Sequence, residues 1–94
     1  MLLPEMEAAA ELVLASHEKF DGSGYPRGLQ GDEIPLGARI LSIADSYDSR
    51  TRPHTCHAAQ SPAEALVEIE RCSGTQYDPR IVEAFSSVLM HVPS

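Results

Sequence analysis

The segment Ser16–Pro26 reads SHEKFDGSGYP and continues as Arg27-Gly28-Leu29-Gln30-Gly31. Its glycines free the backbone, and Pro26 fixes one dihedral angle. Such a glycine-rich stretch beside a His-Glu pair favours a loop folded closely against a site or a partner, whereas many Gly/Pro-rich segments are only connectors. The stretch predicts that one helix ends near His17 and that a long loop follows it.

The residues before this stretch predict a helix from Pro4 to about Glu18. A proline suits the first turn of a helix, and Glu5 and Glu7 favour the positive end of its dipole. Helical spacing puts a set of mostly apolar residues on one stripe, with Leu12 and Leu14 broadening it. That stripe contains Met6, Ala9, Ala10, Val13 and His17. We expect it to face the core.

Three further helices are predicted after the loop, which runs from Lys19 to Pro35. The second covers Leu36 to about Thr51, with an apolar stripe of Leu36, Ile40, Ile43, Ala44 and Tyr47. The third starts at the capping box Ser61-Pro62-Ala63-Glu64, runs to about Cys72 and is ended by Gly74. The last starts at Asp78-Pro79 and runs to about His91. No window alternates as a strand does, so residues 1–94 are expected to form one all-α domain of four helices.

Composition excludes several classes of function. The net charge is −7, with 7 basic against 14 acidic residues, which argues against a general nucleic-acid binder. No segment has the apolar length of a membrane span, and the N-terminus has no basic start of a signal peptide. Cys56 and Cys72 form no CxxC pair and indicate reduced thiols. We expect a cytoplasmic protein that binds neither membrane nor nucleic acid.

A few side chains stand out as candidates for chemistry. His17 is either a packed histidine, a cation at the negative end of a helix, or a ligand. Asp45 lies mid-helix, where aspartate is unfavourable, so it is either solvent-exposed or has a metal or hydrogen-bonding role. His54, Cys56 and His57 lie in the connector from Arg52 to Gln60, but three donors without a fourth do not match a structural zinc pattern.

Taken together, these motifs resemble the HD-GYP family over nearly the whole chain. The matching residues are His17-Glu18, Asp21-Gly22-x-Gly24-Tyr25-Pro26-x-Gly28-Leu29-x-Gly31, Ile34-Pro35, Ala38-Arg39-Ile40, Ala44-Asp45, Asp48, Thr51, Ser61-Pro62-x-Glu64-Ala65-Leu66, Gly74-Thr75-Gln76-Tyr77-Asp78-Pro79 and Ala84-Phe85. The resemblance implies an all-helical phosphohydrolase that cleaves cyclic di-GMP with iron or manganese ions. It implies His17 and Asp45 as metal ligands, because imidazole and carboxylate suit such metals.

The chain also departs from the family pattern. Ser16 stands where the family has the first histidine of a His-His pair, and the upstream His-Asp motif is not in this sequence. The family's phosphate-binding Arg-Pro-Tyr segment aligns with the connector, where Arg52, His54 and His57 are the candidate cations. We therefore expect a partial or degenerate domain whose metal site is weak or empty and which does not hydrolyse alone.

Three roles remain open for such a chain. It is an inactive remnant, an interaction module, or a half-site completed by another chain. In the family the GYP loop is linked to contacts with partner signalling domains, which implies Asp21, Gly22, Gly24, Tyr25, Pro26 and Arg27 as an interaction surface. Helices without their usual partners bury apolar surface by association. We expect a homodimer through Leu12, Val13 and Leu14, or a complementing helical domain. Glu18 is expected to brace the loop, and Tyr77 with Asp78 to form the turn before the last helix.

Overall fold

A computed structural model describes residues 3–53 and 58–90. These residues form the helices α1 (Pro4–Ala15), α2 (Leu36–Thr51), α3 (Pro62–Arg71) and α4 (Pro79–Met90), and a short 3-10 helix η1 (Gly31–Glu33). They contain no β-strand, only an isolated bridge between Ser73 and Tyr77. The all-α prediction is therefore confirmed. None of the described helices is long and apolar enough to cross a bilayer.

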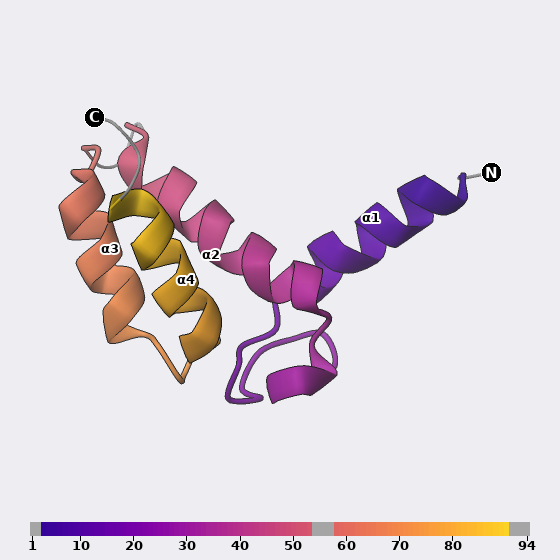
Figure 1. Ribbon diagram of the computed structural model, residues 1–94. Helices are drawn as coiled ribbons and strands as arrows, with labels where there is room; N and C mark the ends of the chain where they lie inside the picture. The colour runs from indigo at the N-terminus through magenta and orange to yellow at the C-terminus, as the bar shows by residue number, and fades with distance from the viewer. Residues whose placement is uncertain (1–2, 54–57, 91–94) are drawn as a thin grey trace.

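The core lies where α2, α3 and α4 meet. Its buried members are Ile43, Ile69, Tyr77 and Val82, and partly buried Tyr47, Cys72, Ile81 and Phe85 pack against them. Tyr47 and Phe85 meet edge to face, with ring centroids 5.2 Å apart, which is a favoured geometry for aromatic pairs. Figure 1 shows α3 and α4 side by side against α2.

Helix caps appear where the sequence predicts them. Ser61 is the N-cap of α3: its hydroxyl accepts from the Glu64 amide at 3.1 Å, and the Glu64 carboxylate accepts from the Ser61 amide at 3.0 Å. Gly74 follows α3 with φ of +89°, the left-handed conformation that glycine adopts without steric cost. The Asp78 carboxylate accepts from the Arg80 amide at 2.9 Å and so caps α4, as expected.

The first helix differs from its prediction in length and in burial. It ends at Ala15 rather than near Glu18, because the amides of His17 and Glu18 bond to carbonyls three residues back and the chain then turns into the loop. No residue of α1 is buried, so the predicted core-facing stripe is wrong: Met6, Val13 and Leu14 are about half exposed or more. Figure 1 shows the reason, since α1 projects from the body and lies close to α2 only at one end.

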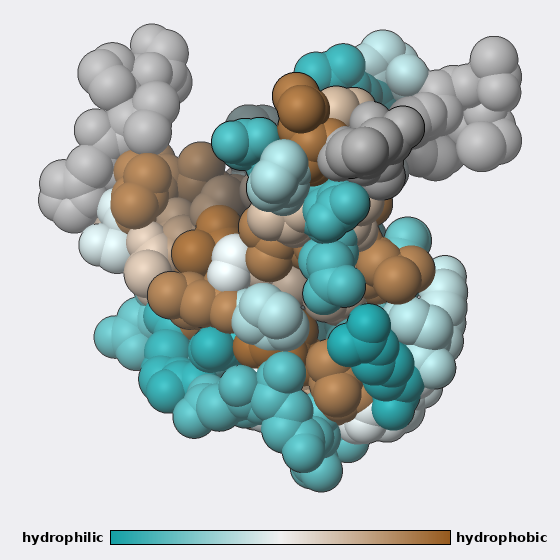
Figure 2. Space-filling view, turned by 90° about the vertical axis from the view of Figure 1, so that its right-hand side faces the viewer, coloured by the Kyte–Doolittle hydropathy of each residue, from teal (hydrophilic) through white to brown (hydrophobic). Residues whose placement is uncertain are grey.

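The apolar stripe predicted for α2 is also partly wrong. Ile43 is buried as expected, but Leu36 and Ile40 are 57% and 49% exposed, and Ala38 is buried instead. The buried residues of α2 are therefore Ala38 and Ile43, and Leu36 and Ile40 of the predicted stripe lie largely in solvent. On the face shown in Figure 2, apolar side chains lie exposed across the middle of the molecule and hydrophilic ones cover its lower part.

Candidate functional site

The glycine-rich loop is held in place by one buried carboxylate. Glu18 is only 4% exposed, and its two oxygens accept hydrogen bonds from the amides of Arg27 at 2.8 Å and Leu29 at 3.0 Å. An ionised carboxylate forms strong hydrogen bonds with backbone amides, as at a helix N-cap, and so fixes the position of the chain that carries them. Glu18 therefore braces the loop, as its position beside the glycines predicts.

The first half of the loop is a tight turn on the surface. The Asp21 carboxylate accepts from the amide of Ser23 at 2.9 Å and from its hydroxyl at 2.6 Å, and these bonds lower the pKa of Asp21. Gly22 has φ of +88°, which favours glycine. A Cβ added at Gly24 would lie 2.4 Å from the Lys19 nitrogen, so the backbone approach there requires glycine. The turn's geometry thus accounts for both glycines.

Backbone bonds tie this turn to the segment before α4. The amides of Phe20 and Asp21 donate to the carbonyls of Gln76 at 3.1 Å and Thr75 at 2.9 Å, and the Gly31 amide donates to the Phe20 carbonyl at 2.9 Å. The loop is therefore attached to a residue range that lies far from it in sequence.

His17 and Tyr25 form an exposed aromatic pair at the edge of the loop. Their rings stack with centroids 5.3 Å apart and an interplanar angle of 10°. His17 is exposed rather than core-facing, and Tyr25 is 64% exposed. Tyr25 precedes Pro26 through a cis peptide bond, and the side chain of Arg27 is exposed as well. The loop thus offers aromatic and cationic groups to solvent.

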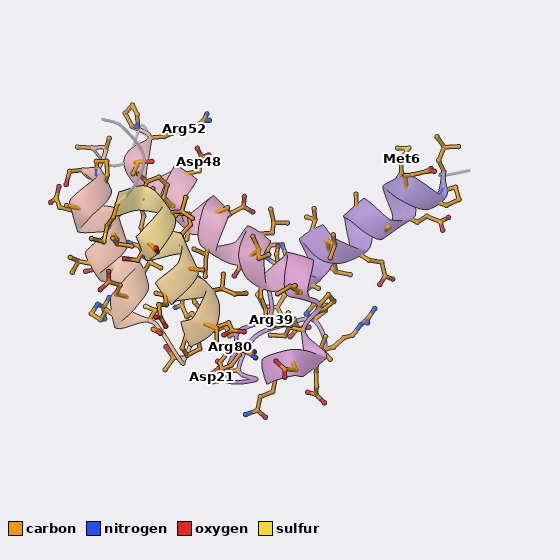
Figure 3. All side chains as sticks on the ribbon, viewed as in Figure 1. Met6, Asp21, Arg39, Asp48, Arg52 and Arg80 are labelled. Carbon is orange, nitrogen blue, oxygen red and sulfur yellow. The ribbon has the colours of Figure 1, made fainter. Side chains whose placement is uncertain are left out.

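Below the loop, an ion-pair cluster joins it to the helical body. The Arg39 Nε donates to the Ile34 carbonyl at 2.9 Å, and its Nη1 donates to the Asp78 carboxylate at 2.7 Å. Arg80 Nη2 reaches Asp78 at 2.8 Å and Asp32 at 2.6 Å. Figure 3 shows Arg39 and Arg80 close together near the start of α4, with Asp21 beside them. Three segments of the chain, those of Asp32, Arg39 and Asp78, therefore meet in this cluster.

Asp78 is the buried charge of this cluster. Its side chain is fully buried, and hydrogen bonds from Arg80 and Arg39 outweigh the burial and lower the pKa of its carboxyl to about 2. Hydrogen bonds to Asp78 and to Asp32 raise the pKa of Arg80. Asp78 is therefore ionised throughout the physiological range, and its charge is neutralised locally.

Sequence reasoning missed this cluster. It placed Asp78 correctly as a cap, and it noted Arg39 only as part of a family motif. Asp32 had no sequence signal as a partner, because a carboxylate 48 residues away from Arg80 has no periodic relation to it. Arg80 two residues after the cap was the one local hint.

The remaining candidate residues are not gathered with the loop by any described contact. Asp45 is exposed on α2. Arg52 follows α2, is exposed, and pairs with Asp48 at 2.8 Å, so Asp48 supports its neighbour. Figure 3 shows this pair at the end of α2 remote from Arg39 and Arg80. His54 and His57 lie outside the described residues, and their predicted phosphate role stays a prediction.

The metal ions implied by the family resemblance need several ligands around one point. In residues 3–53 and 58–90, no three His, Cys, Asp or Glu side chains lie close enough together to hold one ion. The hydroxyl of Ser16, which replaces a family histidine, donates to the Val13 carbonyl. The described residues by themselves therefore do not fit a complete iron or manganese site.

Comparison with known proteins identifies the class. A family model described as the HD domain matches residues 1–81. The chain therefore belongs to the HD domain family. Within it, the chain is related to the cyclic di-GMP phosphodiesterases of the HD-GYP group, which confirms the resemblance carried by the DGSGYP motif.

Three relatives illustrate the match. A cyclic di-GMP phosphodiesterase of Thermotoga maritima is 44% identical over 82 residues, covering 87% of this chain and 22% of the relative. A 3'3'-cGAMP-specific phosphodiesterase of Vibrio cholerae is 37% identical over 91 residues, covering 97% of this chain and 20% of the relative. The crystal structure of a cyclic GMP-AMP-specific phosphodiesterase of Vibrio cholerae superimposes with a TM-score of 0.77 at 33% identity, covering 90% of this chain and 19% of that one. The chain thus spans about a fifth of the length of these relatives.

Proposed function

We propose that this chain serves cyclic dinucleotide signalling as part of an HD-GYP phosphodiesterase domain, and that it does not hydrolyse the dinucleotide by itself. The observation that carries the proposal is the loop: Glu18 holds a DGSGYP turn in a chain 44% identical over 82 residues to a cyclic di-GMP phosphodiesterase. A loop that hydrogen bonds within this chain already hold in shape contributes a preformed surface to the larger domain.

The dependence on further ligands follows from the donors present. The family resemblance assigns His17 and Asp45 to the metal, and two protein ligands bind iron or manganese only weakly. Ser16 is a poor substitute for imidazole, and Glu18 already accepts two backbone hydrogen bonds. We propose that another segment or a second chain supplies the other ligands, so that the metal polarises a phosphodiester only in the completed site.

A second candidate function is contact with a partner signalling domain through the loop. The exposure of Tyr25, 64%, and of the neighbouring Arg27 favours it, because aromatic and arginine side chains dominate the energetics of interfaces. This role would survive the loss of hydrolysis.

Metal content per chain tests the proposal that this chain does not assemble the metal site by itself. The protein is purified without oxygen from iron- and manganese-supplemented medium, and the metal is quantified by mass spectrometry together with hydrolysis of cyclic di-GMP. We expect little metal and no hydrolysis. Near-stoichiometric metal that is lost in His17→Ala and Asp45→Ala, but kept in the control Asp48→Ala, would refute the proposal and show a site assembled by this chain alone.

A further inference from the structure

Two adjacent hollows lie along one face of α1, and the deeper one lies beneath the loop. A cavity of about 160 Å³ lies between the end of α1 and the loop, and a shallower one continues along the helix. Both are lined by Glu11 and Leu14, so they lie next to each other along α1. We call this surface the α1 trough; its principal residues are Glu7, Ala10, Glu11, Leu14, Leu29 and Glu33.

The trough's walls combine apolar and acidic groups. Leu14 is 47% exposed, and together with Leu29, Pro26 and Pro35 it gives the deeper cavity a hydrocarbon wall. Glu7, Glu11 and Leu14 lie on one face of the helix, because residues three or four positions apart are neighbours there. The carboxylates of Glu7 and Glu11 therefore lie beside the apolar side chains of Ala10 and Leu14. The trough suits a ligand that is itself amphipathic.

The charge of the trough is strongly negative. Glu11, Glu18 and Glu33 line the deeper cavity against the single guanidinium of Arg27, and Glu7 extends the negative charge along α1. The first turn of α1 is acidic, and its last turn has no basic residue. A complementary ligand therefore carries positive charge.

The size of the deeper cavity narrows the class of ligand further. At about 160 Å³ it is smaller than the roughly 300–1,000 Å³ of small-molecule pockets, so a dinucleotide does not fit. A single long side chain does. Lysine and arginine bury an aliphatic stem along apolar surface and keep a charged head near acids or water.

We propose that the α1 trough is a docking surface for a basic amphipathic segment of a partner protein, which inserts one lysine or arginine side chain into the cavity under the loop. The stem packs on Leu14 and Leu29, and the head lies near Glu11 and Glu33. The apolar residues of the segment cover the exposed strip of α1. An isolated helix of 12 residues with no buried side chain is marginal in water, so docking also stabilises α1 itself.

A second copy of this chain is a poorer occupant of the trough. Pairing two α1 helices would bring Glu7 and Glu11 of one copy beside acidic residues of the other, and like charges across an interface are unfavourable. The partner that we propose for α1 is therefore a basic segment and not a second copy of the chain.

The probe is a short amphipathic helical peptide of leucine and lysine, with a matched peptide of leucine and glutamate as its negative control. Binding is followed by amide chemical shifts and by titration at low and high salt. We expect shifts at Glu11, Leu14 and Leu29, and an affinity that falls with salt. Glu11→Lys is expected to weaken binding by about tenfold or more, while Glu5→Lys, with the same charge change on α1 outside the trough, changes it far less.

Several outcomes would overturn the proposal. If Glu11→Lys and Glu5→Lys weakened peptide binding equally, binding would depend on the net charge of the protein and not on the trough. Binding of the acidic peptide, or no binding of the basic one, would remove the charge argument. A dimer in sedimentation equilibrium that excludes the peptide and dissociates in Leu14→Asp would assign the trough to a second copy. None of these results depends on metal content or hydrolysis.

Discussion

Replacing Asp78 by asparagine tests the ion-pair cluster that attaches the loop to the helices. The substitution keeps the size of the side chain but removes the buried charge that Arg39 and Arg80 share. Arg39, whose side chain is only 12% exposed, then keeps the Ile34 carbonyl but loses its carboxylate. Breaking a buried pair costs about 3–5 kcal/mol, and because Arg80 is largely exposed we expect the lower end of that range.

The pKa of Asp78 gives a second and independent magnitude. Lowering a carboxyl pKa from 3.8 to about 2 corresponds to about 2 kcal/mol of stability at neutral pH. Because the folded-state pKa is depressed, this stability is fully present above the unfolded pKa and is lost as the pH falls through the folded one. About half of it is gone near pH 3. We therefore expect Asp78→Asn to cost about 2–3 kcal/mol at neutral pH and clearly less in acid.

Urea unfolding followed by circular dichroism at neutral pH and at pH 3 measures the loss of free energy, and thermal unfolding measures the change in melting temperature. At neutral pH, Asp78→Asn is expected to lower the melting temperature by about 10–20 °C for a domain of this size. Asp45→Asn, an exposed carboxylate on α2, is the matched control and should change stability by less than about 0.5 kcal/mol in metal-free buffer. A loss for Asp78→Asn as small as the control's, or one that is unchanged between neutral pH and pH 3, would refute the argument.

Two further predictions concern the loop. Gly24→Ala places a Cβ 2.4 Å from the Lys19 backbone nitrogen, so we expect it to destabilise the protein by about 1–3 kcal/mol in thermal unfolding. The control is Gly37→Ala, which should be near neutral because its Cβ meets the flexible Leu12 side chain. Equal effects of the two substitutions would contradict the close approach at Gly24. Glu18→Gln replaces the carboxylate that accepts hydrogen bonds from two loop amides. Hydrogen exchange at the Arg27 and Leu29 amides should therefore accelerate by about tenfold or more, while exchange at the Ile69 amide stays slow. Unchanged protection at both loop amides would show that the loop keeps its shape without Glu18.

The sequence predicted the helices where local signals were strong. Ser61 and Glu64 form the expected capping box, Gly74 adopts the expected left-handed conformation, and Asp78 caps α4. It failed where burial depends on neighbours. A stripe at helical spacing shows only that one face of α1 is apolar, and within the described chain no residue of α1 is buried. The candidate site shows the same division: the DGSGYP loop was recognisable, but its attachment to Arg39 and Asp78 was not.

The sequence by itself determined the all-α class, the caps, the glycine-rich loop and the family, because each of these depends on residues close together in the chain or on a motif with fixed spacing. The tertiary structure alone decided that Asp78 is a buried anion shared by two arginines, that His17 stacks on Tyr25, and that α1 and the loop enclose an acidic trough. These features join side chains distant in sequence, and their energies come from burial and distance, neither of which periodicity specifies.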